Sequence, residues 1–169
     1  MERENENNLI DLLEYIKNFN MHFELLLRRY NRFKEINNIT NDDIDVITYL
    51  DMIVVQLRAI CIENNTKYKN NYTVQNLLRK VGEEELSQKI ERMLETPFIP
   101  DSDFTVRIAI KTLADNFICH YDNIDFPKID LALAEIIEKR LRSPYDSPNL
   151  DDIMKVLISC VGQGLSIKV

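Results

Sequence analysis

Residues 103–125 read DFTVRIAIKTLADNFICHYDNID, a stretch that predicts a helix ending in polar side chains. Its apolar residues recur every three or four positions and therefore share one helix face: Val106, Ile110, Leu113 and Phe117. His120 follows Phe117 by three residues, which continues the same face to the end of the predicted helix. Because Tyr121 and Asp122 come directly after it, this histidine lies in a polar setting that the other histidine of the chain, His22, lacks.

The rest of the chain carries the same spacing of apolar residues, in the segments 9–33, 47–61, 86–94, 129–141 and 150–161. Valine, threonine and aromatic residues do not alternate with polar residues over a useful length, so strands lack support. A chain of 169 residues has the length of one domain and can bury a substantial core. We predict an all-α fold, an antiparallel bundle of five to six helices in a single domain, residues 1–169.

Local signals predict where several helices begin and end. Thr73 is suited to cap a short helix over residues 74–81, and Gly82 is suited to close it. Asp101 or Ser102 is expected to cap the helix of the 103–125 stretch. Two glycines are expected to end the last helix: Gly162 and Gly164.

Charge narrows the classes of function. The net charge is −7, which argues against a broad electrostatic grip on nucleic acid but leaves room for a local basic patch. Two charged residues, Asp51 and Arg58, lie at the edge of the apolar stripe in residues 47–61. We expect them to pair or to extend to solvent.

Cysteine usage and the termini bear on the compartment. The three cysteines lie far apart within apolar runs and predict buried thiols rather than a zinc site: Cys61, Cys119 and Cys160. The N-terminus has no apolar segment typical of a signal peptide, and no run of 18 apolar residues could cross a membrane. We therefore expect a cytoplasmic protein that uses no membrane, metal or other cofactor.

The order of residues around His120 resembles a known motif. Residues 114–122, ADNFICHYD, are similar to the motif region of the HEPN superfamily, small helical-bundle proteins of bacterial toxin–antitoxin and abortive-infection loci. In the abortive-infection branch this region looks like Arg-Asp-x-x-Ile-Ala-His-x-Asp. The polar residue, the small residue before the histidine, the histidine and the following aspartate all match the motif. The helix over residues 49–63 is also similar to an earlier core helix of that branch.

The resemblance implies a mechanism and a partner. In active HEPN proteins an arginine and a histidine from two subunits meet at the dimer interface and cleave RNA without metal. The histidine would move the proton of the 2′-hydroxyl, and the arginine would stabilise charge on the phosphate. The chain departs from the pattern because Ala114 stands at the arginine position. Arg107 or Lys111 would have to reach in from an earlier turn.

We expect a homodimer that acts in phage defence or toxin–antitoxin biology and binds RNA, a nucleotide or a cognate protein partner. Because the arginine is missing, we do not expect it to be an enzyme. If activity is retained, the protein would be a metal-independent endoribonuclease with His120 as acid and base. The residues that would orient His120 or its substrate are Asp115, Asn116 and Asp122. The candidate binding residues are Arg107, Lys111 and Tyr121. Some family members carry a tyrosine two residues after the histidine, which a partner nucleotidyltransferase modifies, whereas Tyr121 stands one residue after it.

Two other classes of function remain open. A non-enzymatic interaction protein, such as an antitoxin, fits the acidic charge and the missing arginine and needs no nucleic-acid ligand. An all-α nucleotide pyrophosphohydrolase would need clustered carboxylates that hold Mg²⁺. Its candidate ligands lie in residues 83–85 and in the pair Glu135 and Glu138, whose spacing places two carboxylates on one helix face.

Overall fold

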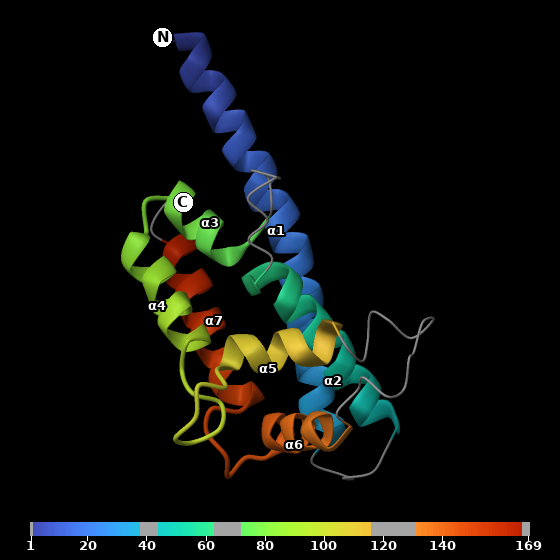
Figure 1. Cartoon of the computed structure of the whole chain (residues 1–169). Coiled ribbons are helices and arrows are strands. Elements are labelled where there is room, and N and C mark those ends of the chain that lie inside the picture. Colours follow the sequence, from blue (N-terminus) through green and yellow to red (C-terminus); the bar gives the residue numbers. More distant parts are fainter. Residues whose placement is uncertain (1, 38–43, 63–71, 116–130, 167–169) are drawn as a thin grey trace.

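The longest helix, α1 (Glu2–Asn37), runs along the whole molecule, and its N-terminal part extends beyond the other helices (Figure 1). The computed structural model describes residues 2–37, 44–62, 72–115 and 131–166, and the side chains of 2–9 and 131 are not among the described parts. A shorter helix, α2 (Ile44–Leu57), packs along α1 and continues into η1 (Arg58–Ile62), one turn of π-helix.

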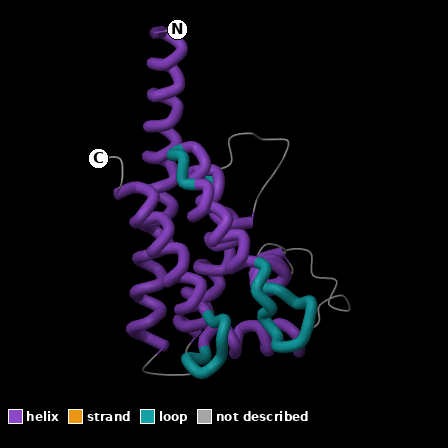
Figure 2. Tube along the Cα trace, turned by 90° about the vertical axis from the view of Figure 1, so that its left-hand side faces the viewer, coloured by secondary structure: helices purple, strands orange, loops and turns teal. Residues whose placement is uncertain are grey.

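Five further helices complete the described fold: α3 (Val74–Lys80), α4 (Glu84–Leu94), α5 (Val106–Leu113), α6 (Leu131–Arg142) and α7 (Leu150–Ser166). The pair α3 and α4 packs together, and α7 lies against α4 (Figure 1). The described residues contain helices and loops but no strand (Figure 2), which confirms the predicted all-α class. Helices α5 and α6 run across the direction of α1 and α7, so the arrangement is less regular than a simple antiparallel bundle (Figure 1).

One face of α1 supplies much of the core. Its buried residues follow the predicted three-and-four spacing: Tyr15, Phe19, Phe23, Leu26, Tyr30, Phe33 and Ile36. Burying each large apolar side chain contributes about 1.5–3 kcal/mol. The stripe therefore fixes which side of α1 faces the bundle.

Polar contacts fix α1 relative to its neighbours. Gln56 of α2 donates to the backbone oxygen of His22 at 2.6 Å and accepts from Arg29 at 2.8 Å. The hydroxyl of Tyr30, also in α1, donates to Asp151 of the last helix, α7, at 2.8 Å. Burial and the bond to Asp151 raise the pKa of Tyr30, so this hydroxyl stays protonated and keeps donating.

The boundary predictions have mixed outcomes. Thr73 caps α3, since its hydroxyl accepts from the backbone nitrogen of Asn76, and Gly82 follows with φ of 83°. The prediction for the cap of α5 was wrong, because Thr105 is the capping residue. Residues 97–104 form a loop instead, in which the Phe98 nitrogen donates to the Phe104 oxygen at 2.7 Å.

The prediction that two glycines end the last helix was also wrong, because α7 continues to Ser166. A Cβ on Gly164 would lie 2.5 Å from Leu78 Cδ2. Leu78 is fully buried, so this glycine lets α7 approach α3 closely. A Cβ on the exposed Gly162 would meet nothing within 4 Å.

This contrast predicts opposite effects for the same substitution at the two glycines. Gly162→Ala should stabilise the fold by about 0.5–1 kcal/mol, because alanine restricts the unfolded chain and fits the helix. Gly164→Ala should destabilise it by about 1–3 kcal/mol through repacking of Leu78. Urea unfolding of both variants measures the two changes, and equal stabilisation would show that α3 and α7 are not closely packed.

Candidate functional site

The structure describes part of the motif around His120. Arg107, Lys111 and Asp115 are described, as is Ala114. The remaining predicted site residues lie outside the described residues: Asn116, His120, Tyr121 and Asp122. The arrangement of these residues and the roles given to His120 stay predictions. Cys119 also lies outside the described residues, so its burial as a free thiol stays a prediction.

Ala114, at the position of the family's arginine, is fully buried. It continues the helical backbone of α5 with φ of −63° and ψ of −43°, and its nitrogen donates to the backbone oxygens of Ile110 and Lys111. Its side chain belongs to the apolar core. A long cation at this position would have to displace core side chains before it could reach solvent.

Asp115, the next residue, forms an ion pair with Arg58 of η1. Arg58 Nε lies 2.7 Å from Asp115 Oδ1, and the two side chains are 28% and 27% exposed. The expectation that Arg58 pairs is therefore confirmed. Arg58 was not among the predicted site residues, although it is the cation that contacts the described part of the motif.

Arg107 is held by two carboxylates, Glu91 of α4 and Glu95, the residue that caps the C-terminal end of α4. Its Nη2 lies 2.5 Å from Glu91 Oε2, and its Nε lies 2.6 Å from Glu95 Oε1. Gln75 of α3 donates to Glu91 at 3.1 Å and to the backbone oxygen of Cys61 at 2.7 Å. These contacts connect η1, α3, α4 and α5, so Arg107 serves the fold, whereas Lys111 is exposed.

Two carboxyl groups with raised pKa values lie on α2 and α6. Burial, followed by the charge of Glu138, raises the pKa of Asp51 from 3.8 to about 6. Burial also raises the pKa of Glu138, although the positive charge of Arg142 opposes the shift. Glu135, the other carboxylate of the predicted pair, forms an ion pair with Lys139, whose Nζ lies 2.7 Å from Glu135 Oε1.

The carboxylates do not support a metal site in the described part of the chain. Within those residues, no group of three or more histidine, cysteine or acidic side chains could hold a metal ion. In the acidic run of residues 83–85, Glu84 forms an ion pair and not a metal site, since its Oε1 lies 3.8 Å from Arg79 Nε. The two described cysteines, Cys61 and Cys160, are buried thiols, as predicted.

A basic pocket of about 630 Å³ lies where the C-terminal ends of α1 and α6 meet the start of α7. Hereafter "the basic pocket" means the cavity lined by Phe33, Lys34, Asn37, Lys139, Leu141, Arg142, Ser143, Pro144, Tyr145, Asn149 and Asp151. Three of these residues are cations and one is a carboxylate. The lining is therefore positive in a chain whose net charge is −7.

The walls of the basic pocket are fixed by hydrogen bonds. Asn37 and Arg142 contact each other twice, through Arg142 Nε to Asn37 Oδ1 at 3.1 Å and Asn37 Nδ2 to the Arg142 oxygen at 3.3 Å. Asn149 donates to the backbone oxygens of Ser143 and Asp146 and so shapes the loop. Tyr145 lies on this loop with 96% of its surface exposed.

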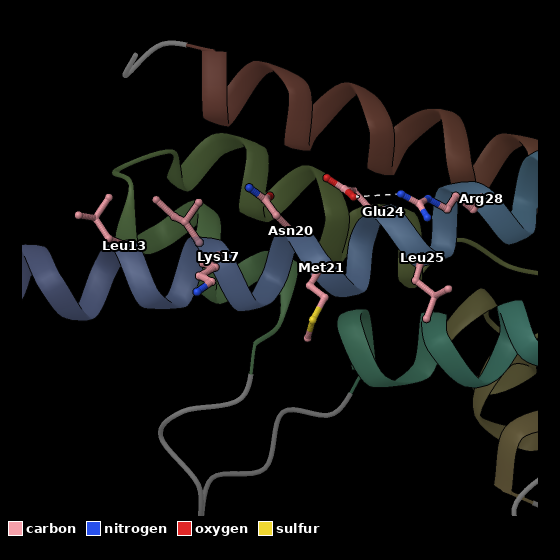
Figure 3. Close-up of a pocket in the computed structure, with 8 residues that line it drawn as sticks. Leu13, Lys17, Asn20, Met21, Glu24, Leu25 and Arg28 are labelled. Carbon is pink, nitrogen blue, oxygen red and sulfur yellow. Dashed lines mark ion pairs between the residues drawn. The ribbon is translucent and has the colours of Figure 1, made fainter.

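Helix α1 also carries apolar side chains on the face that points away from the core. Hereafter "the outer face of α1" means this surface, whose exposed apolar residues are Ile10, Leu13, Met21 and Leu25. Figure 3 shows Met21 and Leu25 projecting from one side of the helix, with Glu24 and Arg28 joined by an ion pair of 3.8 Å. The hollow in this region is lined by α1 residues alone, so it is an open helix surface rather than an enclosed cavity.

Comparison of the chain with models of protein families, with curated proteins and with solved structures gave no match. In the part of the chain that the structure describes, no helix combines the length and the apolar character needed to span a membrane. The candidate sites described above therefore stand on their geometry and chemistry.

The raised pKa of Asp51 predicts a pH-dependent gain from its neutral replacement. The folded state holds this proton more tightly than the unfolded chain, so the destabilisation by this carboxyl group grows as pH rises above 3.8 and reaches its full size above about 6. Asp51→Asn should stabilise the protein at pH 7 by about 1 kcal/mol after allowance for solvent screening. The gain should vanish below the unfolded pKa of 3.8. Urea unfolding across this range measures it, and a gain independent of pH would contradict the assignment.

Proposed function

We propose that the chain is a HEPN-like helical protein of phage-defence or toxin–antitoxin type that binds RNA or a nucleotide without cleaving it. The basic pocket is the observation that carries this proposal. Lys34 and Lys139 flank a floor formed by the buried side chains of Phe33 and Leu141. A pocket with an apolar floor and a few convergent polar groups is typical of a small-ligand site, and its positive charge favours an anion.

The pocket has groups for both parts of a nucleotide. Lys34 and Lys139 would contact phosphate oxygens, for which an ammonium group is a common partner. The ring of Tyr145 would stack on a base, because an exposed aromatic side chain offers a flat face to any base. Single-stranded RNA is bound mainly in this way, by phosphate contacts combined with stacking.

The absence of cleavage follows from how the described cations near the motif are used. Cleavage of the HEPN type needs a cation at the phosphate, and the resemblance places it where this chain has the buried Ala114. Arg107 is held by Glu91 and Glu95, and moving it would leave two carboxylates without their partner. Lys111 is exposed, but a lysine does not reproduce the planar fork of an arginine.

A second candidate function is that of a non-enzymatic interaction protein that binds a cognate protein partner, as an antitoxin does. The outer face of α1 favours it, because exposed apolar side chains on a helix commonly mark a surface for another protein. This function needs no nucleic acid. It is distinguished from the first by whether the basic pocket binds RNA.

The first proposal predicts that RNA binding depends on the basic pocket. Lys34→Glu combined with Lys139→Glu should weaken the binding of a short single-stranded RNA by at least about tenfold, through lost phosphate contacts. The dependence of log K on log salt should become shallower by about 0.7 for each lost contact. Fluorescence anisotropy of labelled RNA measures both quantities.

Lys89→Glu combined with Lys155→Glu is the matched control, because it makes the same change of charge and both lysines are exposed and lie outside the pocket lining. This variant should leave the affinity for RNA almost unchanged. The pocket would not be the binding site if the control variant weakened binding as much as the pocket variant did. An unmodified chain that binds no RNA would favour the interaction protein instead.

The proposal also predicts that the purified protein does not cleave RNA in EDTA. The unmodified chain and His120→Ala should both leave a labelled RNA intact. Metal-independent cleavage that is lost in His120→Ala would overturn the non-cleaving function and show that another cation, such as Lys111, replaces the missing arginine. Lys111→Ala then tests that replacement directly.

A further inference from the structure

The outer face of α1 carries an ordered set of charges. Within eleven residues of Met21, six charged residues of α1 are exposed: Asp11, Glu14, Lys17, Glu24, Arg28 and Arg32. Two more exposed charges, Lys34 and Glu35, lie beyond them, and Glu35 forms an exposed ion pair with Arg32 at 3.0 Å. Read from the N-terminal side, the signs of the six run negative, negative, positive, and then negative, positive, positive. The two halves of the helix thus carry opposite signs at matching distances from Met21.

These distances match closely. Asp11 and Arg32 lie ten and eleven residues from Met21, and Glu14 and Arg28 each lie seven residues away. Lys17 and Glu24 lie four and three residues away. In a pair of antiparallel copies of α1 related by a twofold axis at Met21, each charge would face one of opposite sign. A parallel pair would place like charges together.

From this order of charges and the exposed apolar residues, we propose that α1 pairs in an antiparallel manner with α1 of a second copy of this chain. The twofold axis would lie at Met21, where the two methionines meet. Leu25 would pack near the axis against the aliphatic stem of Lys17, and Leu13 and Ile10 lie progressively further from it. The six charges span about 30 Å of helix, at about 1.5 Å per residue, and they form three opposite-charge pairs on each side of the axis.

The fold leaves this surface accessible. Residues of α1 are rotated by about 100° from one to the next, so Met21 lies away from the buried stripe of Phe19, Leu26 and Phe33. The other helices therefore pack on the opposite side of α1, and the outer face is open to solvent. The ion pair between Glu24 and Arg28 is 3.8 Å long, and its side chains are 67% and 80% exposed. Such an exposed ion pair contributes little to the stability of the fold, so it exchanges easily for ion pairs between two copies.

The proposed pairing goes beyond the proposed ligand binding, because it uses a different surface. It names the interface of the expected homodimer and places it on α1 rather than on the motif around His120. RNA binding depends on Lys34 and Lys139, which are not among the paired charges. Failure of one proposal would therefore leave the measurement for the other unaffected.

Cysteine cross-linking tests the position of the axis. Met21 is 62% exposed, so Met21→Cys should not disturb folding. If the axis passes this residue, two thiols meet across it, and dissolved oxygen, which takes up two electrons and two protons, oxidises them to a disulfide between the copies. We expect a dominant dimer band on a non-reducing gel. Ile158→Cys on α7, where Ile158 is 41% exposed, is the matched control. It should remain monomeric on the gel, as should the unmodified chain.

A charge swap tests the register without cross-linking. Glu14→Arg and Arg28→Glu should each weaken dimerisation by about tenfold or more, because each places like charges opposite one another. The double variant should restore the affinity of the unmodified chain. Sedimentation equilibrium measures all four proteins. An unmodified chain that stays monomeric, a double variant no stronger than the singles, or Ile158→Cys dimers as abundant as those of Met21→Cys would overturn the proposal.

Discussion

Arg107 is bound by Glu91 of α4 and by Glu95, which caps the C-terminal end of this helix, and the packing of the central helices depends on this contact. The same Glu91 accepts from Gln75, which also donates to the backbone oxygen of Cys61 in the π-helical turn. A π-turn alters the regular helical hydrogen bonding, and here Gln75 supplies a partner for one of its carbonyl groups. The network joins four segments, and removing any member would leave a partly buried charge or carbonyl without its partner.

This constraint also limits the chemistry that the chain can perform near its motif. In an acidic protein the positions of the cations decide where an anion can bind. Arg107 and Arg58 are committed to ion pairs with Glu91, Glu95 and Asp115. The lysines at the ends of α1 and α6 line a pocket, and the ion pair that Lys139 forms with Glu135 is exposed to solvent, so it exchanges easily for a ligand. Cations thus stabilise the fold in the middle of the molecule and face a ligand site at one end.

Most of the fold could be predicted from the sequence, because helical periodicity is a local property. The buried stripe of α1 and the cap at Thr73 follow from residues close together in the chain. The role of Gly164 could not be predicted, since it depends on Leu78, a residue distant in sequence. Glycine often ends a helix, but here it permits close packing inside one.

The candidate site was less predictable for the same reason. Lys34 and Lys139 each lie in the last turn of a helix, where a cation commonly complements the helix dipole. Nothing in either local sequence indicates that the two helix ends meet, so the basic pocket appears only in the fold. The pairing of Arg58 with Asp115 likewise joins residues far apart in the chain. The motif around His120 was identified by residue order, and its catalytic residues remain a prediction.

Locating a bound RNA on the protein distinguishes binding in the basic pocket from binding at the motif region. The isotopically labelled chain would be titrated with a short single-stranded RNA while its backbone amide NMR signals are followed. If the basic pocket binds the RNA, the signals that shift should cluster in its walls, in residues 33–37 and 139–151. Shifts confined to the segment from Arg107 to Asp122 would contradict binding in the pocket, because the ligand would then occupy the motif region.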